Sequence, residues 1–162
     1  MPAMGLALVL WNGAERPDVL VSHSGGLVGV MTGEGRALSK ARGEGFAAES
    51  WLENDGDGVS QGEAFDRAGF EGVGRQRRLR LGAAVIMHAT GKVASKQAVE
   101  ACNDVAVLIA NVELDAPEGC RVYDAKRLRE TGALAIRDGG EGPVVTTARE
   151  RAGERIWSGS RD

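Results

Sequence analysis

Hydrophobic positions in the first quarter of the chain alternate with polar or small ones over short stretches, which is the pattern of half-buried β-strands. Two such stretches, residues 19–22 and 27–31, flank the turn Ser24-Gly25-Gly26. A third, residues 36–39, follows the turn at Gly33–Gly35. Because short turns join these stretches, the pattern predicts an antiparallel meander of three strands.

Continuous apolar runs separated by short helical segments follow. Residues 83–87 and 105–110 predict strands, and the second run is typical of a strand that is buried on both faces. Between them, Ser95 is predicted to cap a helix that ends at Cys102. A short strand is expected to begin at Val122-Tyr123.

The last third contains one capped helix and one hairpin. Asp124 and Gly132 are predicted to cap a helix over residues 125–131. Residues 133–137 and 143–147 predict a hairpin around a glycine-rich turn. Together these elements predict an α/β or α+β fold, with short strands and a few short helices arranged as a sandwich.

We place this single domain at residues 16–150 and a polar C-terminal tail at residues 151–162. Residues 1–15 include the apolar run Met4–Trp11, which is much shorter than the ~20 residues that a membrane-spanning helix needs. We interpret this segment either as the end of a membrane-proximal helix or as a buried first strand.

The composition is that of a globular domain, with 43% hydrophobic and 27% charged residues. The net charge of −3 means that bulk electrostatics do not indicate a nucleic-acid partner. Aromatic residues make up only 4% of the chain. Trp51 is expected in the core, which leaves Trp157 and Tyr123 as candidates for stacking on a nucleic-acid base.

An acidic loop resembles the middle of an EF-hand calcium site. With Gly58 at loop position 6, positions 1, 3, 5 and 9 are filled by Glu53, Asp55, Asp57 and Gln61. The ends fit less well, because Ala64 occupies position 12, where a bidentate glutamate is needed.

Two other interpretations of the same loop stay open. The carboxylates of Glu49, Glu53, Asp55 and Asp57 are a candidate magnesium site that would support nuclease chemistry. Alternatively, the loop is a polar turn between a helix over residues 47–53 and a second short helix. Ser60 would cap that second helix, and Glu63 would complete a capping box.

Cys102 and Cys120 are the two cysteines of the chain, too few for a zinc site of the usual spacing. We expect two buried thiols, with a disulfide as the alternative if the domain is extracytoplasmic.

A basic segment covers residues 75–82. Alternate arginines on a strand project from one face, where each can hold a phosphate group. The candidate DNA-binding residues are Arg75, Arg77, Arg78 and Arg80, although Arg78 breaks the strict alternation. The alternative is an edge strand whose charges prevent pairing with other chains.

Four blocks, in order and spread over most of the chain, resemble the C-terminal soluble region of alphaproteobacterial ComEC-type competence proteins. The second block is the most specific. The blocks are Arg16-Pro-Asp-Val-Leu-Val-Ser with the following Gly-Leu-Val-Gly-Val; Gly45-Phe-Ala-Ala-Glu-Ser-Trp-Leu-Glu-Asn-Asp-Gly-Asp; Cys102-Asn-Asp-Val-Ala-Val-Leu-Ile; and Gly153-Glu-Arg-Ile-Trp.

The resemblance implies a soluble domain similar to the metallo-β-lactamase fold, in a protein of the bacterial inner membrane that imports single-stranded DNA during natural transformation. The implied partners are single-stranded DNA and the transmembrane channel portion of the same protein, with no small-molecule substrate and no cofactor. The sequence leaves open which side of the membrane the domain faces.

Hydrolases of that fold need a His-x-His-x-Asp-His cluster and further ligands, because two metal ions activate one water. This chain has only His23 and His88, which cannot supply a binuclear centre. We therefore expect a degenerate, non-catalytic domain. The alternatives are a metal-dependent nuclease that uses the acidic loop and a calcium-stabilised module around Asp55 and Asp57.

Overall fold

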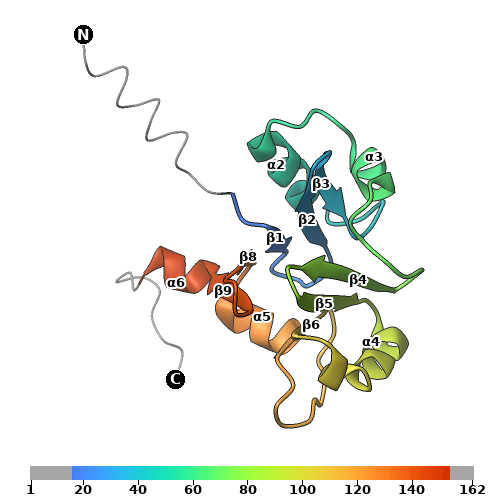
Figure 1. The fold of residues 1–162 in the computed structure, drawn as a ribbon, viewed down its shortest axis with the longest axis vertical. Coiled ribbons are helices and arrows are strands. Elements are labelled where there is room, and N and C mark those ends of the chain that lie inside the picture. Colours follow the sequence, from blue (N-terminus) through green and yellow to red (C-terminus); the bar gives the residue numbers. More distant parts are fainter. Residues whose placement is uncertain (1–15, 154–162) are drawn as a thin grey trace.

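Two β-sheets pack face to face in the computed structural model, which describes residues 16–153 (Figure 1). The first sheet is antiparallel, with the strand order β3-β2-β1-β8-β9. The second has the order β4-β5-β6-β7, in which β4 is antiparallel to β5 and the last three strands are parallel. The strands are β1 (Val19–Val21), β2 (Val28–Thr32), β3 (Gly35–Leu38), β4 (Gln76–Leu81), β5 (Ala84–Ala89), β6 (Val107–Ala110), β7 (Val122–Tyr123), β8 (Leu134–Asp138) and β9 (Pro143–Thr147).

Helices lie on the outer faces of both sheets, which gives four layers (Figure 1). The helices α2 and α3 cover the first sheet, and α4 covers the second. The remaining two helices, α5 and α6, lie together at one end of the sandwich (Figure 1). The helical segments are α2 (Gly45–Asp55), α3 (Gln61–Asp66), α4 (Lys92–Val99), the 3-10 turn η1 (Cys102–Asp104), α5 (Ala125–Thr131) and α6 (Ala148–Ala152).

The main core fills the space between the sheets, because successive side chains of a strand point to opposite faces. Val21 of β1 and Ile86 of β5 are fully buried there. The central strand β6 is buried on both faces, with Ile109 in this core and Leu108 packed beneath α4. The predicted mixed α and β architecture in one small domain is therefore confirmed.

Local capping chemistry sets several element ends as predicted. Ser60 accepts the Glu63 backbone N–H and forms a capping box at the start of α3. Asp124 accepts the Arg127 N–H at the start of α5, and the Gly132 N–H caps its end. These ends are predictable because each depends on residues only three or four positions apart.

The predicted start of the helix before Cys102 is wrong. The helix α4 begins after Gly91, so Ser95 lies inside it and is buried. Gly91 adopts a φ of +82°, and its N–H donates to Asn111 Oδ1 at 2.7 Å. A tertiary contact with Asn111, just after β6, thus fixes the start of the helix about one turn before the predicted cap at Ser95.

A short helix spans the predicted start of the polar C-terminal tail. Thr147 and Glu150 form a second capping box, and α6 continues through Ala152, across the predicted boundary at residue 150. Residues 1–15 and 154–162, including the predicted membrane-proximal segment and Trp157, lie outside the described residues.

Gly25, in the turn between β1 and β2, must be a glycine for two reasons. Its φ is +68°, and a Cβ there would lie 2.6 Å from the Ala110 carbonyl oxygen and 2.8 Å from Leu128 Cδ1. The turn therefore packs directly on the end of β6 and on α5.

We expect Gly25→Ala to destabilise the domain more than Gly56→Ala. Gly56 has a similar φ of +73°, but its Cβ would meet nothing within 4 Å. The Gly56 variant isolates the backbone strain of about 1–2 kcal/mol, to which overpacking adds roughly 1–3 kcal/mol at Gly25. Urea unfolding of both variants measures the difference, and equal losses would contradict the close packing of this turn.

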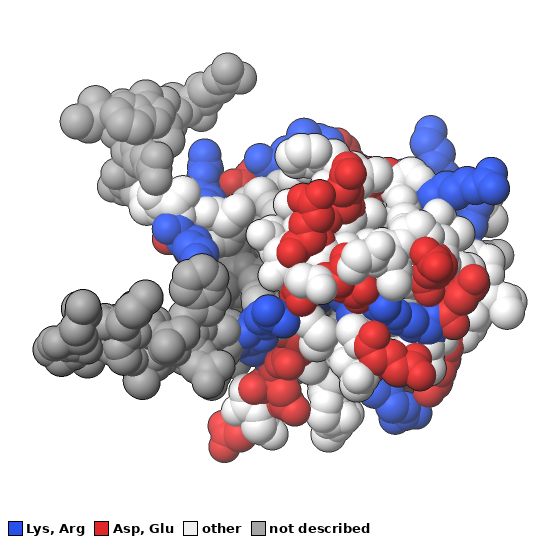
Figure 2. Space-filling view, turned by 90° about the horizontal axis from the view of Figure 1, so that it is seen from above, with Lys and Arg blue, Asp and Glu red and all other residues white. Residues whose placement is uncertain are grey.

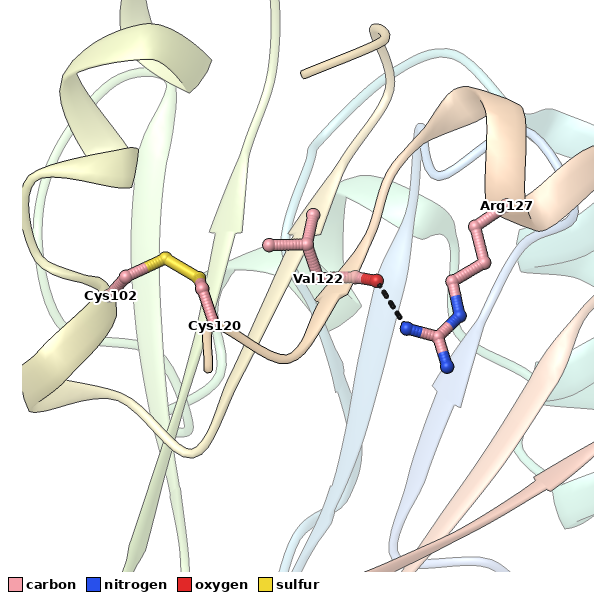
Figure 3. Close-up of a disulfide and its surroundings, with 4 residues drawn as sticks. All are labelled: Cys102, Cys120, Val122 and Arg127. Carbon is pink, nitrogen blue, oxygen red and sulfur yellow. Dashed lines mark hydrogen bonds between the residues drawn. A yellow bond between two sulfur atoms is a disulfide. The ribbon is translucent and has the colours of Figure 1, made fainter. Parts of the chain in front are cut away.

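A disulfide joins Cys102 to Cys120, so the expectation of two free buried thiols is wrong (Figure 3). Their Cα atoms lie 5.5 Å apart. The bond connects η1, which follows α4, to the loop that leads into β7. Beside it, Arg127 of α5 donates to the Val122 carbonyl at 3.0 Å (Figure 3). The short strand β7 is thereby held from both sides.

Candidate functional site

The acidic loop meets two arginines. Arg36 of β3 is fully buried, and its Nε donates to Asp55 Oδ2 at 2.5 Å. Arg36 Nη2 reaches Asp55 Oδ1 at 3.3 Å and the Pro17 carbonyl at 3.4 Å. This fork fastens the C-terminal end of α2 to the first sheet.

A second ion pair lies beside the first. Arg67 pairs through both terminal nitrogens with the carboxylate of Asp57, and Arg67 Nη1 also donates to the Arg36 carbonyl at 3.1 Å. The hydrogen bonds from Arg67 lower the pKa of Asp57, and Asp57 in turn raises the pKa of Arg67. The two pairs connect α2, α3 and β3.

The four predicted calcium ligands do not converge. Asp55 and Asp57 face arginines, while Glu53 is exposed on α2. Gln61 turns its amide towards the preceding loop and donates to the Lys40 and Gly43 carbonyls. Within residues 16–153, no group of three or more His, Cys, Asp or Glu side chains is placed to hold a metal ion.

The four predicted DNA-binding arginines do not share one face. Arg78 and Arg80 project outward from β4, whereas Leu79 and Leu81 point into the core. Arg77 shares the inner face of the strand with these leucines and stacks on the Phe65 and Phe70 rings, at 4.9 and 5.8 Å from their centroids. Arg75 precedes the strand.

The outer arginines lie on an edge strand. Glu71 pairs with Arg78 through two backbone hydrogen bonds of 2.7 and 2.8 Å, and the Glu71 side chain lies 3.5 Å from Arg80 Nε. An edge strand that carries charge and is partly covered by a neighbouring segment resists pairing with other chains. Arg78 and Arg80 therefore agree with the interpretation of this segment as an edge strand whose charges prevent pairing with other chains.

Several loops of the domain meet where the parallel strands end. The turn after β1, the loop after β3, and the carboxyl ends of β5 and β6 all lie at the same end of the sandwich. Ser24 donates to Glu44 Oε1 at 2.7 Å across this end, which we call the strand-end edge. Ligand sites of open α/β sheets commonly lie at such carboxyl ends.

His88 lies buried beneath the strand-end edge. The Gly25 carbonyl can only accept, so His88 Nε2 donates to it, at 2.9 Å. Burial lowers the pKa of His88 to about 4, and the neighbouring charges of Lys40 and Arg77 act in the same direction. His88 is therefore neutral in the folded domain at physiological pH, and His23 is exposed.

We expect stability to fall by about 2 kcal/mol between pH 7.5 and pH 5 because of His88. The unfolded histidine binds a proton below about pH 6.5, whereas the folded one does so only near pH 4. Stability is thus complete above the unfolded pKa and is lost as the pH falls towards the folded pKa. Urea unfolding at both pH values measures the loss.

The matched variant for this measurement is His88→Gln, which keeps a donor but does not titrate. Its stability is expected to change much less over the same pH range. The carboxylates with lowered pKa, Asp57, Glu63 and Glu150, lose their contributions at lower pH. An equal loss in wild type and variant between pH 7.5 and pH 5 would contradict the assignment to His88.

Among the aromatic candidates, Tyr123 is 4% exposed and is covered by the Arg127 guanidinium, 4.3 Å from the ring centroid, so it offers no stacking surface. Trp51 is half-buried against the core beneath α2, as expected. Phe46 was not predicted as a surface aromatic, although it is 88% exposed at the start of α2. The only sign of this exposure in the sequence is that Phe46 follows a glycine-rich loop and lies at the start of a helix.

Charge on the face shown in Figure 2 is mixed, because acidic and basic side chains are both scattered among uncharged ones. A scan against protein-family models and searches of the curated proteins and of the solved structures find no match for this chain. None of the helices in the described part of the chain is long and apolar enough to cross a membrane.

Proposed function

We propose that this domain is the C-terminal soluble region of a ComEC-type DNA-uptake channel and that it contacts single-stranded DNA without cleaving it. The observation that carries the proposal is where the resembling blocks fall in the fold. The first builds β1 and β2, the second builds α2, and the third builds η1 and β6. The resemblance therefore concerns three different layers of the domain rather than one loop.

The architecture also supports the proposal. Two facing sheets between helical layers fit the metallo-β-lactamase-like arrangement that the resemblance implies. His88 and Ser24 at the strand-end edge are engaged with the scaffold, since His88 donates to the Gly25 carbonyl and Ser24 to Glu44. Engagement of this kind favours a binding surface over a hydrolytic centre.

The disulfide supports a location on the oxidising side of the inner membrane, because such bonds persist in the bacterial periplasm and are rare in the cytoplasm. In cells that express the full-length protein, Cys102 and Cys120 are expected to react with a membrane-permeable maleimide only after reduction. Modification of both thiols without a reductant would place the domain in the cytoplasm.

The proposed function is tested by fluorescence anisotropy with a labelled single-stranded oligonucleotide at several salt concentrations. Binding is expected to weaken steadily as salt increases, because each phosphate contact releases counterions. The label is expected to stay on a full-length strand when Mg²⁺ or Mn²⁺ is added. Absence of binding at about 20 mM salt would refute the proposal, and metal-dependent cleavage would support the nuclease alternative.

A further inference from the structure

Four cations at the strand-end edge have no carboxylate partner. They are Lys40 in the loop after β3, Arg75 before β4, and Lys92 and Lys96 on α4. Within residues 16–153, none of the four takes part in an ion pair. Arg36, Arg67, Arg80 and Arg129, by contrast, each face an acid, whereas Arg78 on the outer face of β4 also takes part in no ion pair within residues 16–153.

Neighbouring contacts bring these cations together. The Thr90 N–H donates to the Arg75 carbonyl at 2.9 Å. A Cβ on Gly91 would lie 2.6 Å from Arg75 Nη1, so the Arg75 guanidinium lies directly over the residue that precedes Lys92. Lys40 is close enough to His88, which donates to the Gly25 carbonyl at the same edge, for its charge to contribute to the lowered pKa of His88. We call these four residues the basic ridge.

The repulsion between the two lysines of α4 lowers the local stability of the helix. Lys92 and Lys96 are four residues apart, so they occupy one face of the helix and repel each other by a few tenths of a kcal/mol. Both are exposed, and Lys96 makes no ion pair with Glu100, which lies four residues further on at the end of the helix. Such a locally unfavourable choice is expected where a surface binds an anion.

A hollow of about 410 Å³ adjoins the ridge. Lys92 and Lys96 form one wall, and Val112, Glu113 and Leu114 form the other. The second wall is fixed, because the Leu114 N–H donates to Asp124 Oδ2 at 2.9 Å. The carboxylate of Glu113 is paired with Arg129 on its far side. The hollow therefore offers an apolar surface beside two unpaired cations.

We propose that the basic ridge holds successive phosphates of a single strand of DNA and that the hollow takes an unpaired base. This inference rests on the proposed function and assigns its binding surface to the strand-end edge rather than to the outer face of β4. Unpaired cations complement the backbone, and the hollow admits a base only when the base is unstacked. Duplex DNA keeps its bases stacked and is expected to bind more weakly.

Two double variants with the same change in charge test the assignment. Lys92→Ala with Lys96→Ala removes two cations from the ridge, and Arg78→Ala with Arg80→Ala removes two from β4. The lysine pair is expected to weaken oligonucleotide binding at least about tenfold at 50 mM salt and to lower the salt slope by about 1.4. The arginine pair is expected to show only the smaller loss that accompanies two fewer positive charges.

Glu113→Gln tests the same assignment through an expected increase in affinity for the oligonucleotide. Removing this carboxylate from the hollow is expected to tighten oligonucleotide binding about twofold to fivefold, because a nearby anion repels the phosphates. The residue is exposed, so the variant is expected to melt like wild type. Unchanged or weaker binding by this variant would contradict the place of the hollow in the interface.

The outcomes separate this inference from the proposed function. If wild type binds no single-stranded DNA, the proposed function fails. If wild type binds but the arginine pair weakens binding as much as the lysine pair or more, DNA contact stands and the basic ridge is wrong. Equal binding of single-stranded and duplex DNA would contradict the proposal that the hollow takes an unpaired base. Binding to vesicles of anionic phospholipid but not to DNA would show that the basic ridge contacts a membrane instead.

Discussion

Asp55→Ala is expected to destabilise the domain by about 3–5 kcal/mol, the largest effect of any substitution considered. The reason is that the change leaves the guanidinium of Arg36, which is fully buried, without its carboxylate. Arg36 Nη1 already has no hydrogen-bond partner, and the remaining contact of Nη2 is with the Pro17 carbonyl, which is neutral and does not replace the lost carboxylate. Guanidinium chloride unfolding followed by circular dichroism measures the loss.

Asp57→Ala is the matched control. It breaks the neighbouring pair with Arg67, whose side chain is 14% exposed and can turn towards water, so a loss of about 1 kcal/mol or less is expected. A double change of Arg36→Met with Asp55→Leu removes both buried charges and is expected to recover much of the stability. Equal losses for the two alanine variants would show that burial of Arg36 does not decide the effect.

Removal of the disulfide is expected to cost about 3 kcal/mol and to lower the melting temperature by roughly 10 °C. The bond closes a loop with a sequence separation of 18, and opening it returns conformational freedom mainly to the unfolded chain. Calorimetry of the Cys102→Ser, Cys120→Ser double variant measures the shift.

Reductant provides the control for this prediction. Wild type treated with dithiothreitol is expected to melt at about the same temperature as the double variant, while dithiothreitol has no effect on the variant itself. A melting temperature of wild type that is unchanged by reduction would contradict a stabilising role for the bond. It would also weaken the argument that the domain matures in an oxidising compartment.

Short-range patterns predicted much of the fold. The strands of the first sheet, the capping box at Ser60 and the helix begun by Asp124 all depend on residues within a few positions of one another. The continuous apolar run in β6 also predicted its burial on both faces correctly, because a strand with one face in water would show polar positions. Ser95 failed as a cap because the Gly91–Asn111 contact spans 20 positions.

The candidate site was less predictable from its residues. The EF-hand-like spacing of Asp55 and Asp57 is real, but the spacing carries no information about Arg36 and Arg67, which face these carboxylates in the fold. The arginines of residues 75–80 looked like one surface, although the strand pleat sends Arg77 to the inner face and Arg78 to the outer one. Which face of β4 points into the core, and therefore which arginines are exposed, was decided only by the tertiary structure.

The sequence by itself determined the element types, the mixed α and β class and the absence of enough histidines for a binuclear centre. These properties depend on composition and on contacts between near neighbours in the chain. Only the tertiary structure decided that Cys102 bonds to Cys120, that His88 is buried and neutral, and that Arg75 lies over Gly91, the residue before Lys92. Each of these results from strand order, which brings distant segments together and which no local pattern encodes.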